Sequence, residues 1–130
     1  MSSAYRTALA FVAVAGVLGA VLPTAEAGPT THSDNACITM GHIQNTKMAS
    51  PRVLLVRADG GHTFRIGFAS DCNSAASFGV VMHPFDNSGQ VCQPLALDIS
   101  VRDTGERCIA NSLSRLSDEE VAALPPRLRP

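Results

Sequence analysis

The pattern of apolar residues predicts a β-hairpin in the middle of the chain. Residues 52–58 form a run rich in valine and leucine, and residues 62–69 alternate apolar with polar side chains. Between them, Asp59-Gly60-Gly61 supplies residues that tolerate positive φ, as hairpin turns require. The continuous run is typical of a central strand, whereas alternation is typical of a strand with one packed face and one wet face. The residues of the packed face are Phe64, Ile66 and Phe68.

A second alternating segment predicts another hairpin towards the C-terminus. Apolar side chains occupy every second position from Leu97 to Val101. Asp103-Thr104-Gly105 then turns the chain, and residues 106–113 return as the partner strand. Between the two hairpins, residues 78–82 form a short apolar run that ends before Pro84, which predicts a brief strand. We therefore predict a small all-β domain of about five antiparallel strands in a rolled sheet or partial barrel.

One short helix is predicted after the last strand. Ser117 is a suitable N-cap, and Glu120 stands three residues later, which completes the capping-box pattern. Leu116 is placed to pack against Val121 in a hydrophobic staple. Pro125 and Pro126 end the helix after about two turns, so it must lie on the sheet to be stable. The core predicted from these patterns comprises Val53, Leu55, Phe64, Ile66, Phe68, Val81, Leu97, Ile99, Val101, Ile109, Leu113, Val121 and Leu124.

The first 27 residues predict a cleavable secretory signal peptide. The single early charge, Arg6, precedes the apolar segment Ala8–Leu22, and small residues follow up to Ala27. This segment is shorter than the roughly 20 apolar residues that a transmembrane helix needs. We expect cleavage after Ala27 and a periplasmic or secreted location. The chain is then divided into a signal peptide over residues 1–27, a flexible arm over 28–36, one β-rich domain over 37–124 and a C-terminal tail over 125–130.

Length and charge exclude several classes of function. The chain has 130 residues, enough for one compact domain. Ten Lys and Arg against eleven Asp and Glu give a net charge of -1, so the chain lacks the basic surface typical of nucleic-acid-binding proteins. Aromatic residues make up 5% and tryptophan is absent, which leaves few side chains on which bases or sugars could stack. We expect no nucleic-acid partner, and no stable membrane insertion once the signal peptide is removed.

The four cysteines predict two disulfide bonds. They are Cys37, Cys72, Cys92 and Cys108, and export would place this even set where thiols oxidise. Their spacing contains no Cys-x-x-Cys or Cys-x-x-His pair, which disfavours a zinc site and a catalytic dithiol. Four cysteines allow three connectivities. The pairing that we favour joins Cys72 with Cys92 and Cys37 with Cys108.

No familiar catalytic motif is present in the sequence. The histidines lie in or near predicted loops and strand ends, where a solvated imidazole is ordinary; they are His32, His42, His62 and His83. The carboxylates of Asp118, Glu119 and Glu120 are explained by the helix start, because the unpaired amides there stabilise negative charge.

The two hairpins also carry arginines, which would bind an acidic partner if they met on one face, although a solvated sheet surface is the more ordinary interpretation. These arginines are Arg57, Arg65, Arg102 and Arg107. Three scattered methionines are expected to fill gaps in the core, because the flexible methionine side chain adapts to irregular spaces. They are Met40, Met48 and Met82.

The order of the cysteines and of the segments between them is distinctive. Residues 37–124 contain all four cysteines. Gly60-Gly61 stand between two predicted strands, and the last cysteine precedes the helix start Leu-Ser-Asp-Glu-Glu at residues 116–120. This order resembles a family of small exported bacterial four-cysteine proteins that form a domain of unknown function. The loop after Cys72 departs from that pattern, since it continues Asn-Ser-Ala in place of Pro-Gly-Leu. The resemblance implies export and a bacterial envelope setting, and it implies no catalytic residue.

Together these observations predict an exported, non-catalytic envelope protein. We expect loops on a disulfide-stabilised β scaffold to bind another envelope protein or a small ligand. We also expect a monomer that uses neither a cofactor nor a metal ion. The alternative is a redox or metal-handling periplasmic protein that uses its cysteines with nearby histidines.

Overall fold

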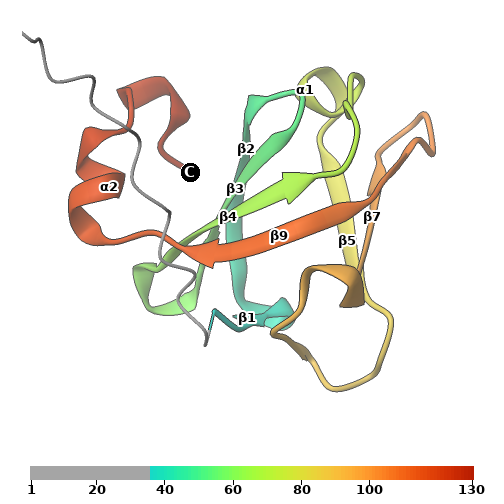
Figure 1. Ribbon diagram of the computed structural model, residues 1–130, viewed down its shortest axis with the longest axis horizontal. Helices are drawn as coiled ribbons and strands as arrows, with labels where there is room; N and C mark the ends of the chain where they lie inside the picture. Colours follow the sequence, from blue (N-terminus) through green and yellow to red (C-terminus); the bar gives the residue numbers. More distant parts are fainter. Residues whose placement is uncertain (1–35) are drawn as a thin grey trace, which may run out of the picture. The chain divides into compact units, whose positions relative to one another are not determined.

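The computed structural model describes residues 36–130, except for the side chain of Asp59. The signal peptide predicted over residues 1–27 and most of the predicted arm lie outside the described residues. Figure 1 shows the arrangement of the elements. In chain order they are β1 (Ile38–Thr39), η1 (Met40–His42), β2 (Ile43–Ser50), β3 (Val53–Ala58), η2 (Asp59–Gly61), β4 (Thr63–Phe68), α1 (Ala75–Phe78), β5 (Val80–Pro84), β6 (Gln90–Val91), η3 (Pro94–Ala96), β7 (Leu97–Val101), β8 (Arg107–Cys108), β9 (Ala110–Arg115), α2 (Asp118–Ala123) and η4 (Pro126–Leu128).

The predicted central hairpin is confirmed and forms the middle of a four-stranded antiparallel sheet. The strand order is β2-β3-β4-β9, so β3 has a neighbour on each side, as its continuous apolar run indicates (Figure 1). Gly60 and Gly61 make the turn between β3 and β4, both at positive φ. Across the hairpin, Val56 pairs with Phe64. Both side chains are buried, because cross-strand neighbours share a face of the sheet.

Two smaller antiparallel sheets contain the remaining strands. One has the order β5-β7-β8, and the other joins β1 to β6. There are more strands than the five or so expected, for two reasons. β2 carries the polar run Gln44–Lys47 and therefore lacks an alternating pattern, and β1, β6 and β8 have only two residues each. The predicted fold class is confirmed, since the described residues form a mainly β, antiparallel structure with short helices and no closed barrel.

The chain changes from one sheet to another at Ile109. β8 pairs with β7, and the following strand β9 pairs with β4, so the single return strand predicted over residues 106–113 is divided in two. Asn111 forms a bulge in β9, because Gly67 pairs with Ser112 while the next residue of β4 pairs with Ala110. The bulge shifts the alternation of inward and outward side chains. Ile109, predicted in the core, is consequently 59% exposed, and that prediction was wrong.

Strands from all three sheets contribute side chains to one main core. The prediction is confirmed there for Phe64, Ile66, Phe68, Leu97, Ile99, Val101 and Leu113. Four other predicted core residues are only half-buried; they are Val53, Val81, Val121 and Leu124. The methionines predicted to fill gaps, Met40, Met48 and Met82, do pack against this core.

A second, smaller apolar layer lies on the other side of the main sheet. Leu55 and Leu116 are buried but do not belong to the main core. Side chains alternate along β3, so Leu54 and Val56 enter the main core while Leu55 points to the opposite face. The C-terminal element η4 approaches β2, and Pro130 is buried. The last residues therefore pack back onto the domain.

α2 begins with the capping box that the sequence predicts. The main-chain N–H of Glu120 donates to Ser117 Oγ at 3.2 Å, and the main-chain N–H of Ser117 donates to the Glu120 carboxylate at 2.8 Å. The helix ends at Ala123, before the two prolines. The other α-helix, α1, has four residues and was not predicted.

Two disulfide bonds are present, but they differ from the pairing favoured on sequence grounds. Cys37 is joined to Cys92, and Cys72 is joined to Cys108. Cys37 immediately precedes β1 and Cys92 immediately follows β6, so the pairing of β1 with β6 brings their Cα atoms to 4.0 Å. The favoured pairing was wrong because both bonds depend on contacts between strands that are distant in sequence, and periodicity does not report such contacts.

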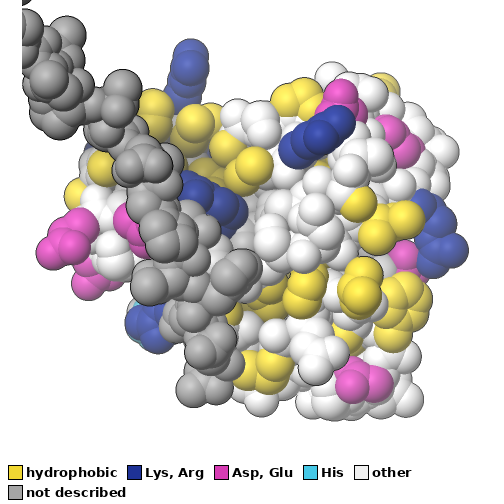
Figure 2. All heavy atoms as spheres, viewed as in Figure 1, with side chains coloured by type: hydrophobic (Ala, Val, Ile, Leu, Met, Phe, Trp, Pro, Cys, Tyr) yellow, Lys and Arg dark blue, Asp and Glu magenta, His cyan; other side chains and the backbone are white. Residues whose placement is uncertain are grey.

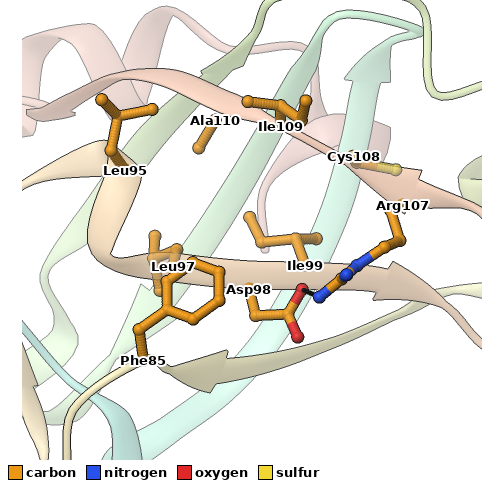
Figure 3. Close-up of a pocket in the computed structure, with 9 residues that line it drawn as sticks. All are labelled: Phe85, Leu95, Leu97, Asp98, Ile99, Arg107, Cys108, Ile109 and Ala110. Atoms are coloured by element: carbon orange, nitrogen blue, oxygen red, sulfur yellow. Dashed lines mark hydrogen bonds and ion pairs between the residues drawn. The ribbon is translucent and has the colours of Figure 1, made fainter.

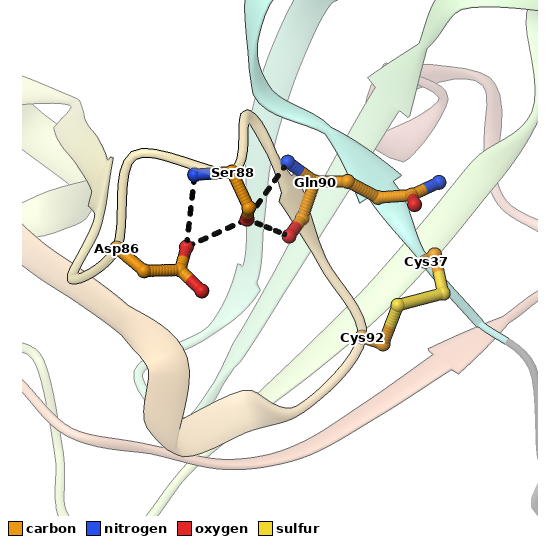
Figure 4. The surroundings of a disulfide bond; sticks show 5 residues. All are labelled: Cys37, Asp86, Ser88, Gln90 and Cys92. Atoms are coloured by element: carbon orange, nitrogen blue, oxygen red, sulfur yellow. Dashed lines mark hydrogen bonds between the residues drawn. A yellow bond between two sulfur atoms is a disulfide. The ribbon is translucent and has the colours of Figure 1, made fainter.

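The bond between Cys37 and Cys92 lies beside an ordered turn (Figure 4). Ser88 Oγ is 2.6 Å from Asp86 Oδ1 and 2.8 Å from the main-chain oxygen of Gln90, so one hydroxyl organises the turn that leads into β6. Cys92 is exposed, whereas Cys72 and Cys108 are both buried. Cys37 is half-buried, so the first disulfide is accessible from solvent at Cys92, whereas the other belongs to the core.

The disulfides bear on the compartment in which the protein folds. Two such bonds in a small domain indicate an oxidising, extracellular or periplasmic environment. Within residues 36–130, no helix is long and apolar enough to cross a membrane.

Candidate functional site

An apolar hollow of about 330 Å³ opens between β7 and the chain that runs from β8 into β9. This volume lies in the range of roughly 300 to 1,000 Å³ that is usual for small-ligand sites. In Figure 3, Leu95, Ile109 and Ala110 border it on one side, and Phe85 and Leu97 border it on the other. The complete lining is Phe85, Leu95, Leu97, Asp98, Ile99, Arg107, Cys108, Ile109 and Ala110.

The hollow exists because β7 loses its partner strand halfway along its length. β8 pairs with Ile99 and Ser100, and the chain then leaves towards β4. In the part of the chain that the structure describes, no strand pairs with Leu97 and Asp98 on that side of β7. The short helix η3 lies against β9 and closes one end. The departure of β9 from β7 thus leaves a wedge-shaped space.

Exposed apolar side chains gather around this hollow. Four large apolar side chains are exposed among residues 36–130, and three of them line the hollow: Phe85 at 66%, Leu95 at 69% and Ile109 at 59%. The fourth, Phe78, belongs to α1. Figure 2 shows hydrophobic side chains gathered on the face that carries β9 and η3. Single exposed apolar residues are ordinary, but a cluster around a concave surface is typical of an interaction site.

An ion pair forms the polar end of the hollow. Arg107 Nη2 lies 2.8 Å from Asp98 Oδ1, and both side chains contribute to the lining (Figure 3). The Arg107 side chain is 68% exposed, so water screens the pair and its contribution to stability is small. The guanidinium carries five N–H donors, and the carboxylate accepts several hydrogen bonds. The pair thus offers both a donor and an acceptor to a ligand whose apolar part fills the hollow.

The four cysteines, which were the predicted site residues, divide between two places. The Cys72–Cys108 bond is buried, and Cys108 forms part of the wall of the apolar hollow. The Cys37–Cys92 bond lies outside that lining, at the edge of the β1–β6 sheet. None of the four is a free thiol.

The histidines are not brought together. His42, His62 and His83 are exposed and belong to η1, the turn before β4 and β5 respectively, and His32 lies outside the described residues. His62 Nδ1 is 2.6 Å from Arg115 Nη2. Across residues 36–130, no group of three or more histidine, cysteine, aspartate or glutamate side chains is placed to hold a metal ion.

The arginines of the two hairpins occupy different surfaces. Arg57 and Arg65 lie on β3 and β4, on the face of the main sheet opposite Val56 and Phe64. Arg107 lines the apolar hollow, and the remaining one, Arg102, follows β7. The structure therefore does not assemble the four arginines into a single basic surface.

The acidic run at 118–120 has the structural role expected of it. Asp118, Glu119 and Glu120 form the first turn of α2, and Glu120 closes the capping box. Negative charge is stabilised at this end of a helix.

Glu106 links two elements near the turn after β7. The main-chain N–H of Ser74, just before α1, donates to a carboxylate oxygen of Glu106 at 3.0 Å. Hydrogen bonds from the main chain and the hydroxyl of Ser74 lower the pKa of Glu106 below its ordinary value, because they stabilise the charged form. This carboxylate ties the start of α1 to the β7–β8 turn.

The residues of the apolar rim were not predicted from the sequence. The pattern predicts no role for Phe85 or Leu95, and it predicts Ile109 in the core. A usable signal was present, since Phe85 and Leu95 each directly follow a proline and lie outside the apolar runs 78–82 and 97–101 that predict strands. A large apolar residue in a proline-containing loop has no strand pattern to explain it, and the exposure of such a residue favours a binding role.

Comparison with known proteins gave a negative result. No protein-family model, no curated protein and no solved structure matches this chain.

Proposed function

We propose that this is an exported, non-catalytic binding protein of the bacterial envelope, and that the apolar hollow receives an apolar group of its ligand. The observation that supports the proposal is the gathering of Phe85, Leu95 and Ile109 around one concave space. Exposed apolar surface disfavours solubility, so its concentration in one place favours a purpose in recognition.

The polar groups of the hollow favour binding over catalysis. Its ionisable lining residues are Asp98 and Arg107, and these two are paired with each other. A largely apolar lining with a few polar groups recognises shape and apolar surface, while the polar groups orient the ligand. Because the lining is largely apolar and its two ionisable residues are paired, we propose a non-catalytic role.

The envelope setting is part of the proposal. It is supported by the signal-peptide pattern of residues 1–27, by the resemblance to exported four-cysteine proteins, and by the two disulfides. The alternative, a redox or metal-handling protein, has less support, because all four cysteines are paired.

A fluorescent apolar probe tests the hollow directly. We expect 1-anilinonaphthalene-8-sulfonate to bind the purified, oxidised protein, and the variant Leu95→Ser/Ile109→Ser to bind it at least about tenfold more weakly, a loss of roughly 1.4 kcal/mol. Phe78→Ser is the matched control, since it removes the exposed large apolar side chain that lies outside the hollow. Equal weakening by both variants, or none by the double variant, would refute the proposed site.

Photo-crosslinking in the exporting cell then tests the biological ligand. A photoreactive amino acid at position 95 should form an adduct that disappears with Ile109→Ser, whereas the same amino acid at position 78 should not form that adduct. The mass of the adduct distinguishes a protein partner from a small molecule. If position 95 gives no adduct, or if the same adduct still forms in the Ile109→Ser variant, the proposed ligand does not occupy the hollow.

A further inference from the structure

A second feature lies at the outer strands of the two larger sheets. β2 is an outer strand of the four-stranded sheet, and β5 is an outer strand of the three-stranded sheet; among the described strands neither has a second partner. We call the space between Ile43–Ser50 and Val80–Pro84 the β2–β5 seam. In the part of the chain that the structure describes, β2 and β5 are not paired with each other.

The seam contains two hollows that follow each other along β2. One, of about 400 Å³, is lined by residues 43–46 of β2 and residues 80–82 of β5. The other, of about 240 Å³, is lined by residues 46–48 of β2 together with α1 and Val80. Both hollows therefore lie beside residues 43–48 of β2.

The strand edges supply main-chain hydrogen-bonding groups. In an antiparallel pair, alternate residues direct their N–H and C=O groups away from the partner strand. On β2, the main-chain N–H of Thr46 donates at 2.8 Å to the side chain of its neighbour Asn45. An incoming strand adds main-chain hydrogen bonds at such an edge.

The side chains along the seam indicate the chemistry of that strand. Met40, Met48 and Met82 contribute apolar, adaptable surface to the two hollows. The charged residues that line them are Lys47 and Arg102, both exposed, and neither lining contains an acidic residue. A segment that alternates apolar and acidic residues would place its apolar side chains against the methionines and its carboxylates near the two cations.

We propose that the β2–β5 seam binds an extended segment of a partner protein, in which apolar residues alternate with acidic ones, by strand addition. A second copy of this chain fits less well. Antiparallel pairing of β2 with the same strand of another copy would bring the two Lys47 side chains close together near the centre of the new sheet, and like charges on paired strands are destabilising. This inference is independent of the apolar hollow at Phe85, Leu95 and Ile109, because the two linings share no residue.

Selection from a library of random peptides tests the seam, because the natural partner is not needed. The probe is a displayed library of peptides of about ten residues, the upper length of an ordinary strand, selected on the purified oxidised protein. We expect the enriched peptides to alternate apolar and acidic residues. A synthetic enriched peptide should bind Lys47→Glu/Arg102→Glu at least about tenfold more weakly than the unmodified protein. Arg115→Glu, an exposed charge on β9 at the opposite edge of the four-stranded sheet, is the control and should leave binding unchanged.

Two further measurements keep the result interpretable. Hydrogen exchange should show that the amides of β2 and β5 become protected when the peptide binds. Unchanged thermal unfolding and unchanged binding of the fluorescent probe to the apolar hollow would show that the double variant is folded. Enrichment of basic peptides, protection confined to other strands, or equal binding by the double variant would overturn the proposal, even if the apolar hollow proves to be functional.

Discussion

Ile99 and Ile109 are chemically identical and ten positions apart, yet their environments are opposite. Ile99 lies on β7 and is 1% exposed, whereas Ile109 lies between β8 and β9 and is 59% exposed. The bulge at Asn111 causes this difference, since it changes which side chains of that segment face inward. Stability and binding should therefore depend on different isoleucines.

Alanine substitutions at these two positions make that distinction measurable. We expect Ile99→Ala to lower the free energy of unfolding by about 2–5 kcal/mol, because it leaves a cavity in a packed core. Ile109→Ala should lower it by less than about 1 kcal/mol, because its side chain is largely in water. Urea unfolding of both variants measures the two values. A cost at Ile109 as large as the cost at Ile99 would mean that Ile109 is not an exposed rim residue.

At the scale of secondary-structure elements, a specific hydrogen bond stabilises the short helix α1. α1 has only four residues, and a helix of that length is not stable alone. The hydrogen bond from the Ser74 N–H to Glu106 joins its start to the turn after β7, which contains Gly105 at positive φ. The depressed pKa of Glu106 shows that the contact favours the ionised carboxylate.

This link makes part of the stability dependent on pH. Because the pKa of Glu106 is lower in the folded than in the unfolded chain, its contribution is complete above the ordinary value of 4.5 and is lost as the pH falls through the folded pKa. We expect Glu106→Gln to lower the unfolding temperature at about pH 7, and the difference from the unmodified protein to shrink towards zero as the pH falls below the folded pKa.

The control for that measurement is Asp103→Asn, which removes one negative charge from an exposed position in the same turn and keeps a residue that tolerates positive φ. Thermal unfolding followed by circular dichroism at several pH values provides the comparison. If the deficit of Glu106→Gln is the same at both ends of the pH range, the hydrogen bond with Ser74 does not contribute in the way described.

At the scale of the whole molecule, the two disulfides join distant parts of the chain. They connect residues 55 and 36 positions apart, and each loop closure of this length contributes about 4 kcal/mol in the chain-entropy description. Their accessibility differs, because Cys92 is exposed whereas Cys72 and Cys108 are buried. The bond that is accessible at Cys92 closes the small β1–β6 sheet, and the buried bond belongs to the main core.

Limited reduction should therefore open the bonds in a fixed order. With low concentrations of dithiothreitol, we expect Cys37 and Cys92 to become alkylated first, because attack on a disulfide requires access to its sulfur atoms. Cys72 and Cys108 should react only when the domain unfolds. Mass mapping of alkylated peptides identifies the labelled cysteines at each stage. Early labelling of Cys72 or Cys108 would contradict the burial of that bond.

Local features of the sequence were sufficient for several elements whose structure depends on neighbouring residues. The β3–β4 hairpin was predictable because its turn needs glycines at positive φ and its strands show apolar periodicity. The start of α2 was predictable because a capping box involves residues only three apart. The presence of two disulfides followed from the number of cysteines and the expected compartment.

Tertiary structure alone decided the features that depend on distant contacts. The disulfide pairing follows from which strands meet, and the apolar hollow exists because β9 leaves β7 to pair with β4. Apolar periodicity did not predict β2, because the sequence of this strand is largely polar. The strand nevertheless forms one side of the β2–β5 seam. Both candidate binding surfaces lie where a strand lacks a partner along part of its length. Strand pairing is a long-range choice, and for that reason the sequence pattern by itself did not reveal either surface.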